Sequence, residues 1–369
     1  MDSKPTQTRR FAEGTAAASL SGPESSQPPA PPSVPFFDPA ENAWVVSRYA
    51  DVLAALREPA LRPAGPQKAP AHVREDVLDT LSQSKLADWQ EQIESLADRN
   101  AAELPAGRPV DLVSEVLRPW SLSVATIMLG FDAPACQQLT ALQQHLAAGN
   151  ADTPVPRRSL PSVWLAVRRR IANARLDSLL RNARVRGAKS LFIGLSQTVP
   201  FFLANAWLAL LENPSQLGRL RTEPHLIPRA IEELLRYCGT VHTLVRKADR
   251  TVELAGVAIA KDQKVLLKVA VANRDPKQFA DPDSLDITRR SGHIALGMGP
   301  HSCVGAMAVR IAAISATRAF AGKLAQAELI EPVIWRRGSV HGSPFALRVR
   351  FGRMKTSERA EITPSREAS

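Results

Sequence analysis

A glycine-rich stretch near the C-terminal end of the chain, residues 293–310 (HIALGMGPHSCVGAMAVR), carries the residue types best suited to chemistry. Its spacing is G-x-G-x-H-x-C-x-G, formed by Gly297, Gly299, His301, Cys303 and Gly305. Glycine permits positive φ angles and close approach of the backbone, so the cysteine can lie in a tight turn. The apolar helical pattern that follows would direct its positive end at the sulfur, and this favours a thiolate.

Two interpretations of this cysteine compete. Most free cysteines in intracellular proteins are small buried hydrophobes. That interpretation explains neither the glycine spacing nor the helix that follows. A thiolate held by a glycine loop against a flat cofactor is instead suited to be an axial ligand of haem iron.

The composition limits the number of domains and the kinds of disulfide or metal site that the chain can form. The chain has 369 residues, 44% of them hydrophobic, enough for one large domain or two ordinary ones. Its three cysteines form no close pair, and its seven histidines form no H-x-x-x-H or H-E-x-x-H pattern. We therefore expect neither a disulfide framework nor an ordinary metal site, and a reducing cytoplasm fits this use of cysteine.

The chain is strongly basic, with a formal net charge of +11. Much of this charge comes from residues 168–189 (RRRIANARLDSLLRNARVRGAK), where cations alternate with Leu and Ala at roughly helical spacing. Such a pattern is typical of a solvated helix face. The segment has no interleaved aromatic residues and the chain has no known nucleic-acid-binding signature, so we do not expect a nucleic-acid partner.

The elements that must position the cysteine are mostly helical. Residues 43–49 predict a strand, 50–58 a helix, 73–146 further helices, and 251–268 and 344–351 strands. The expected fold class is mainly α, an α-rich α+β fold with small antiparallel β-sheets.

The outer segments differ in composition from the middle of the chain. Residues 1–34 are rich in Pro, Ser, Ala and Gly, which predicts a disordered leader. Residues 35–353 are expected to form a single domain, and residues 354–369 a flexible charged tail.

One uncharged stretch, residues 190–211, is long enough to span a bilayer. Polar residues and a proline nevertheless lie along it: Ser196, Gln197, Thr198, Pro200 and Asn205. We therefore expect no stable membrane span but the central helix of a large domain.

A pair of opposite charges precedes the cysteine loop. Glu233 and Arg236 are spaced i, i+3 in residues 230–237 (AIEELLRY), so both lie on one helix face and can pair. Residues 272–289 then read ANRDP…F.DPD..D.TR, and the cysteine loop follows.

These three features, in this order and spacing, resemble a bacterial cytochrome P-450, a haem-thiolate monooxygenase. Residues 44–63 more weakly resemble the N-terminal strand and first helices of that family. The resemblance covers residues 36–352 and identifies the chain as a short, divergent member. It implies a helical domain with small β-sheets around a buried haem b (iron protoporphyrin IX).

The resemblance also implies roles for individual residues. Cys303 would be the proximal ligand of the iron, in a loop shaped by Gly297 and Gly305. The residues that would brace the haem-binding core are Glu233, Arg236, Asn273 and Arg274. Those that would hold the propionates are Arg246, His301 and His72, although a plain surface role remains an alternative for Arg246 and His72.

The chain departs from the family around the cofactor. The family's Phe seven residues before the cysteine is Leu296, and Asp76 stands where the family favours Arg. An aliphatic residue should still cover the sulfur. The segments 61–74 and 130–194 are also shorter than in relatives, which predicts an open or unusual substrate pocket.

The central helix departs more seriously, because the family's acid–alcohol pair is replaced by Ser196 and Gln197. Neither side chain titrates usefully, so an ordinary proton relay is absent. Thr198 can substitute only if the helix is locally offset. Pro200 cannot donate to the carbonyl of Ser196, so the helix should kink and leave that carbonyl free to hold a water. A packing role for Pro200 explains the residue equally well.

The leading hypothesis is a cytoplasmic monooxygenase of bacterial secondary metabolism, with a ferredoxin-type electron donor and an apolar small-molecule substrate. The lost acid–alcohol pair leaves open a peroxygenase or a non-oxygenating variant. A non-catalytic P-450-like partner that stabilises another enzyme is the third possibility, although such partners usually lose the cysteine.

Overall fold

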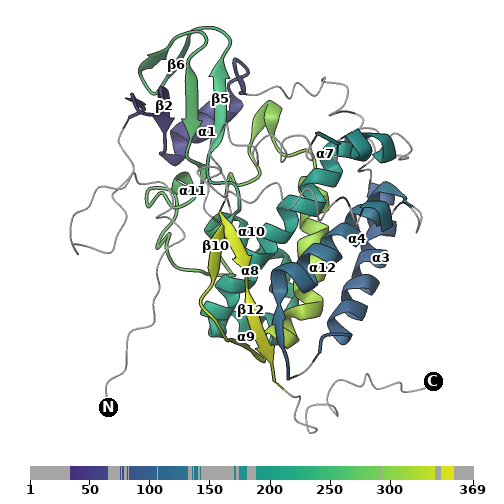
Figure 1. The fold of residues 1–369 in the computed structure, drawn as a ribbon. Coiled ribbons are helices and arrows are strands. Elements are labelled where there is room, and N and C mark those ends of the chain that lie inside the picture. The colour runs from purple at the N-terminus through teal and green to yellow at the C-terminus, as the bar shows by residue number, and fades with distance from the viewer. Residues whose placement is uncertain are drawn as a thin grey trace, which may run out of the picture.

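A computed structural model gives the fold of the chain (Figure 1). It describes residues 34–64, 75, 77–78, 81, 83–105, 107–131, 135, 137–139, 142, 170–171, 174–180, 188–290, 292–336 and 342–352. The basic segment 168–189 and both outer segments therefore lie wholly or partly outside the described residues, as do His72 and Asp76.

Helices make up most of the described chain. They are α1 (Tyr49–Arg57), α3 (Gln83–Ala102), α4 (Arg118–Leu129), α7 (Ala188–Ile193), α8 (Val199–Glu212), α9 (Pro214–Thr222), α10 (Ile227–Cys238), α11 (Val269–Ala272) and α12 (Ala306–Leu324). Two π-helices, η2 (Leu112–Leu117) and η3 (Gly194–Thr198), and two 3-10 helices, η4 (Pro224–Leu226) and η5 (Gly299–His301), are also present, and residues 174–180 are helical as well.

The strands form small sheets. A five-stranded sheet has the order β1 (Phe36–Asp38), β2 (Ala43–Val46), β8 (Lys264–Leu267), β5 (Leu244–Ala248), β3 (Leu61–Pro63). The others are β4 (Pro109–Asp111), β12 (Arg348–Phe351) and β9 (Ala327–Leu329); β6 (Val252–Leu254) with β7 (Val257–Ile259); and β10 (Ile334–Arg336) with β11 (Ser343–Ala346).

Two sequence predictions about strands need correction. The pairing of β2 with β8 is parallel, so the sheets are not purely antiparallel. Residues 344–351 form two strands rather than one. The backbone of Leu347 turns between them, donating to Asp111 Oδ1 at 2.9 Å and accepting from Leu112 N at 2.9 Å. The chain thereby changes partner from β10 to β4 and β9.

The five-stranded sheet and α1 lie at one end of the molecule, and the helices α3, α4, α8, α10 and α12 pack beside one another at the other (Figure 1). α7, η3 and α8 run as one continuous helical stretch through this second part. In α8 the Trp207 ring is fully buried against Phe320 of α12, with ring centroids 5.0 Å apart. Residues 190–211 thus form a core helix, as predicted.

Two helical stretches among the described residues, 112–129 and 188–212, are long and apolar enough to cross a membrane. Most of each stretch is buried inside the fold: 67% of the first apolar window and 72% of the second. Packing against the neighbouring helices explains their apolar character.

Candidate functional site

The cysteine loop is a tight turn between η5 and α12. Gly297 and Gly299 both have φ of +70°, the left-handed region that favours glycine. A Cβ on Gly299 would also lie 2.8 Å from the carbonyl oxygen of Leu56, because the loop packs against α1. The backbone N–H of Cys303 donates to the carbonyl of Leu296 at 2.7 Å, which closes the turn.

Cys303 lies in the wall of a cavity of about 300 Å³. Leu296, Gly297 and His301 from the same loop also line it. The other walls come from η3 and the start of α8, from the segment between α10 and β5, and from Val309 of α12. Segments far apart in the sequence thus meet around the sulfur, and most of the side chains they contribute are apolar. Leu296 is joined to Cys303 by the backbone hydrogen bond that closes the turn, and Cys303 itself is exposed.

The central helix is offset at the cavity. Residues 194–198 form a π-turn in which the N–H of Val199 donates to the carbonyl of Gly194, five residues back. A π-turn accommodates one more residue than an α-turn, so the positions that follow are shifted along the helix. Gly194 and Thr198 line the cavity, whereas Ser196 and Gln197 are not among the lining residues. The π-turn lies just before Pro200, the second residue of α8.

Arg246 is a buried cation close to this cavity. It lies on β5, two residues after Leu244, so both side chains project from one face of the strand. Leu244 lines the cavity, and Arg246 is 4% exposed. Burial lowers the pKa of its guanidinium. Within the described part of the chain no carboxylate pairs with it, and its guanidinium donates one hydrogen bond, to the carbonyl of Val245 at 3.3 Å.

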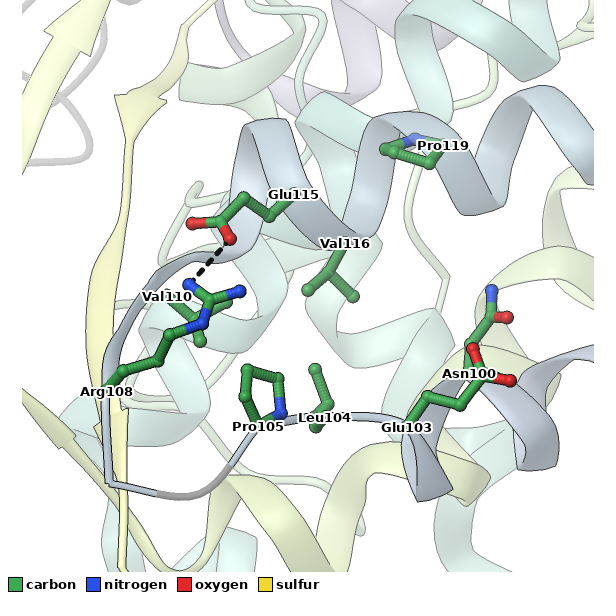
Figure 2. A pocket seen from close by; sticks show the side chains of 9 residues that line it. All are labelled: Asn100, Glu103, Leu104, Pro105, Arg108, Val110, Glu115, Val116 and Pro119. Atoms are coloured by element: carbon green, nitrogen blue, oxygen red, sulfur yellow. Dashed lines mark ion pairs between the residues drawn. The ribbon is translucent and has the colours of Figure 1, made fainter.

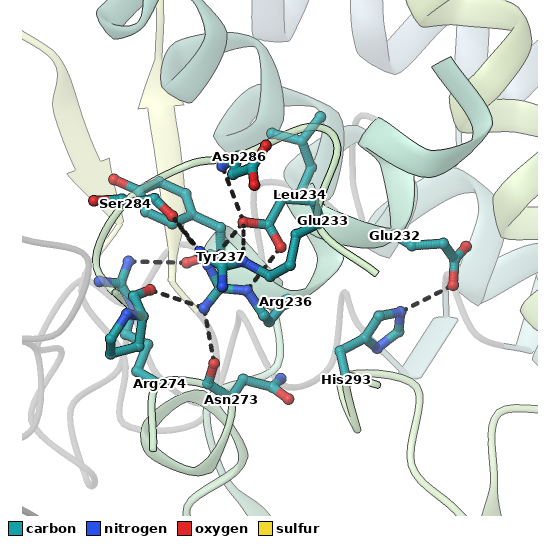
Figure 3. A network of polar contacts seen from close by, with 12 residues as sticks. Glu232, Glu233, Leu234, Arg236, Tyr237, Asn273, Arg274, Ser284, Asp286 and His293 are labelled. Atoms are coloured by element: carbon teal, nitrogen blue, oxygen red, sulfur yellow. Dashed lines mark hydrogen bonds and ion pairs between the residues drawn. The ribbon is translucent and has the colours of Figure 1, made fainter. Parts of the chain in front are cut away.

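Glu233 and Arg236 form a buried ion pair, both side chains being fully inaccessible (Figure 3). Arg236 Nε and Nη2 each donate to the Glu233 carboxylate at 2.8 Å. Arg236 Nη1 also donates to the carbonyls of Asn273 at 2.9 Å and Pro282 at 2.8 Å, and Arg289 Nε donates to Glu233 at 3.1 Å. Such a network holds α10 to the segment that leads into the cysteine loop.

Asn273 and Arg274 belong to the same region, as expected from the sequence (Figure 3). The side-chain oxygen of Asn273 accepts from the N–H of Ile294 at 2.9 Å, so it fixes the backbone just before the cysteine loop. Arg274 pairs with Asp283, donates to the carbonyl of Tyr237 at 3.0 Å and lies 4.6 Å from the Tyr237 ring centroid.

Comparisons with known proteins agree with this architecture. A family model for cytochrome P450 matches residues 219–312, which contain both the buried ion pair and the cysteine loop. The chain is 30% identical over 358 residues to nocardicin C N-oxygenase of Nocardia uniformis subsp. tsuyamanensis, covering 84% of this chain and 89% of that protein. The chain belongs to the cytochrome P450 family.

Other similarities of this P450 extend over most of its length. It is 26% identical to beta-dihydromenaquinone-9 omega-hydroxylase of Mycobacterium tuberculosis, covering 81% of this chain and 70% of that protein. The crystal structure of CYP109B1 from Bacillus subtilis superposes with a TM-score of 0.75 at 24% identity, covering 86% and 96% of the two chains. The α-rich P450 fold is thus confirmed, and the family is one of monooxygenases that carry haem.

The residues around the cavity fit a haem. A cysteine faces a largely apolar space, its loop packs closely enough on α1 to exclude a Cβ at Gly299, and a buried arginine beside the space has no carboxylate among the described residues. Carboxylates such as propionates are the natural partners of a buried guanidinium. Gly305 caps α12 beside Leu191 of the central helical stretch.

The sequence did not lead us to a second cluster of charged and polar side chains beside the cysteine loop. Glu232, adjacent to Glu233, accepts from Arg310 Nε at 2.7 Å and Nη2 at 2.8 Å, and contacts His293 Nε2 at 3.1 Å. The consecutive glutamates in residues 230–237 were the available signal, because neighbouring positions on a helix point in different directions.

A second cavity, of about 320 Å³, lies where α3 ends and where β4 and η2 follow (Figure 2). Its rim carries an ion pair between Arg108 and Glu115 at 2.9 Å. This cavity shares no lining residue with the cavity at Cys303. None of the residues singled out by the sequence lies in its wall.

Proposed function

We propose that this P450 holds haem b through Cys303 and inserts an oxygen atom from dioxygen into an apolar small molecule, with electrons from a ferredoxin-type partner. The observation that carries the proposal is the position of Cys303 in the wall of a largely apolar cavity, directly before α12. When bound, the haem supplies an iron at which dioxygen is activated, and the thiolate donates electron density that favours O–O cleavage.

The other groups of the site have positioning tasks in this proposal. Arg246 and His301 hold the propionates by charge-assisted hydrogen bonds, and His72 is a further propionate contact. Leu296 is the apolar residue that we assign to cover the sulfur when the haem is bound. The Glu233–Arg236 pair keeps α10 and the segment around Asn273 in place behind the loop.

Thr198 is the hydroxyl that we assign to proton handling on the substrate side. It lines the cavity, and a hydroxyl both donates and accepts hydrogen bonds. Ser196 is 2% exposed and does not reach the cavity wall, and the Gln197 amide does not titrate. Thr198 therefore takes the alcohol position that the unshifted sequence pattern assigns to Gln197.

The proposed electron donor is an acidic, ferredoxin-type protein. Arg57, at the end of α1, is exposed, and its backbone lies against Gly299 of the cysteine loop. A cation at this place and the net charge of +11 favour association with an acidic protein by electrostatic steering.

A peroxide-using reaction is the second candidate function. It is favoured by the composition of the cavity wall, because no carboxylate lies among the described residues that line it.

We assign the cytoplasm as the place of action and residues 35–353 as the single functional domain. The intact cysteine loop disfavours a non-catalytic partner role.

The test is the carbon monoxide difference spectrum of the dithionite-reduced protein, recorded with Cys303→Ser in parallel. We expect a strongly red-shifted Soret band in the wild type and its loss in the variant, because serine does not supply a thiolate. A protein without haem, even after expression with a haem precursor, would contradict the proposal. Turnover with NAD(P)H and ferredoxin, compared with turnover by peroxide, then separates the two candidate reactions.

A further inference from the structure

Three charged or polar side chains meet beside the cysteine loop and form a cluster separate from the Glu233–Arg236 pair. Glu232 lies on α10, Arg310 on α12 and His293 at the start of the loop segment. The side chain of His293 is 5% exposed, and those of Glu232 and Arg310 are 26% and 29% exposed. Figure 3 shows Glu232 reaching His293 on the side away from the Glu233 network.

The hydrogen bonds define the form of His293. Its Nδ1 accepts from the backbone N–H of Ala295 at 3.2 Å, so in the neutral ring Nε2 carries the proton. That proton points at Glu232 Oε2, 3.1 Å away. The carboxylate of Glu232 thus receives three donors, two from the planar fork of Arg310 and one from His293.

The cluster joins both ends of the cysteine loop to one helix. His293 precedes Ala295 and Leu296, which line the cavity, and Leu296 accepts from the N–H of Cys303. Arg310 follows Cys303 by seven residues, about two helical turns. Glu232 therefore ties the chain before the sulfur and the chain after it to α10.

We propose that Glu232, Arg310 and His293 are positioning residues for Cys303, a brace that clamps both ends of its loop onto α10. The charges of the brace balance each other next to the sulfur, so that neither a free cation nor a free anion acts on the group held there. This inference rests on the proposed haem-thiolate function.

The electrostatics of the cluster support the same arrangement. Burial would raise the pKa of Glu232, but hydrogen bonds from Arg310 and His293 outweigh it and bring the pKa to about 2. The pKa of Arg310 is raised by its hydrogen bond to Glu232, which outweighs the opposing effect of burial.

The test uses the haem-loaded full chain with Glu232→Gln, Arg310→Gln and Arg310→Lys. A second glutamate–arginine pair, Glu94 with Arg318 at 2.8 Å, also anchors α12 and supplies matched controls, Glu94→Gln and Arg318→Gln. Haem transfer to apomyoglobin measures how firmly the loop holds its ligand, and redox titration measures the reduction potential. The wild-type carbon monoxide spectrum tests the proposed function separately.

We expect Glu232→Gln and Arg310→Gln to speed haem loss about tenfold or more, since each leaves one charged partner uncompensated. The reduction potential should rise in Glu232→Gln, which leaves a free cation, and fall in Arg310→Gln, which leaves a free anion. Arg310→Lys keeps the charge and should restore the potential. The Glu94 and Arg318 controls should change neither quantity.

Two results would overturn the brace. One is wild-type rates of haem loss in both single variants. The other is a shift of the potential in the same direction in both variants, because opposite charges must act with opposite signs. Should Glu232→Gln fail to fold, Arg310→Lys, which keeps the positive charge, and Arg310→Gln, which removes it, still test the electrostatic part, and equal reduction potentials in these two variants would overturn it.

Discussion

At the scale of single residues, Thr198 carries the proposed chemistry on the substrate side of the cavity. It is placed there by the π-turn of residues 194–198, which moves Ser196 and Gln197 out of the cavity lining. In the proposed function, Thr198 therefore takes over the task of the family's alcohol from the neighbouring position.

We expect Thr198→Val to slow product formation about 10²-fold, the usual contribution of a positioned proton-transfer group, while haem binding is unchanged. Product and peroxide release per NAD(P)H consumed give the measurement. Gln197→Leu is the matched control on the neighbouring position and should have little effect. A larger loss in Gln197→Leu than in Thr198→Val would show that the relay does not use Thr198.

A second prediction at this scale is that Glu232 makes the stability of the folded protein depend on pH. Its pKa is near 2 in the folded protein, below the ordinary value of 4.5, so the folded state binds fewer protons than the unfolded state between these values. The stabilisation is complete above pH 4.5 and is lost as the pH falls towards 2. Urea midpoints should therefore fall more steeply between pH 6 and pH 3 in the wild type than in Glu232→Gln; parallel curves would contradict this.

At the scale of elements, the buried Glu233–Arg236 pair decides whether α10 and the segment before the cysteine loop stay together. Both side chains are excluded from solvent, and the pair also binds the backbone of residues 273, 282 and 284. Removing one partner leaves the other charge buried without compensation.

Arg236→Leu should therefore destabilise the protein by about 3–5 kcal/mol. The exposed pair of Arg219 with Glu223 on α9 provides the control, and Arg219→Leu should have little effect on stability, because water screens an exposed ion pair. Urea unfolding followed by tryptophan fluorescence measures both. Equal costs for the two variants would mean that the buried network does not join these elements.

At the scale of the whole molecule, the distribution of charge should govern the meeting with an acidic electron donor. Arg57 lies beside the cysteine loop, whereas Arg221 is exposed on α9, at the other end of the molecule from α1 (Figure 1). Substitutions at these two arginines can therefore separate the effect of a charge near the loop on the rate of reduction from the effect of the net charge.

Arg57→Glu should slow reduction by an acidic ferredoxin at low ionic strength, and the difference should shrink above about 0.1 M salt, where the Debye length is ~10 Å. Stopped-flow reduction under carbon monoxide measures the rate. Arg221→Glu makes the same change in net charge away from the loop. If it slows reduction equally, steering acts through the net charge and not through the face at Arg57.

Several features of this P450 could be predicted from the sequence because the patterns that specify them are local. The glycines around Cys303, the i, i+3 spacing of Glu233 and Arg236, and the apolar run of residues 190–211 each predict structure from a few adjacent positions. The turn, the ion pair and the core helix all follow these patterns. The family and its α-rich fold could therefore be inferred from the residues alone.

Only the tertiary structure decided the features that depend on distant segments. The offset of the central helix arises from a π-turn at residues 194–198, a backbone geometry that the sequence pattern did not specify. The parallel pairing of β2 with β8 joins residues far apart in the chain. Glu232 meets Arg310 and His293 because α10, α12 and the loop converge, and no local spacing specifies where three separate segments meet.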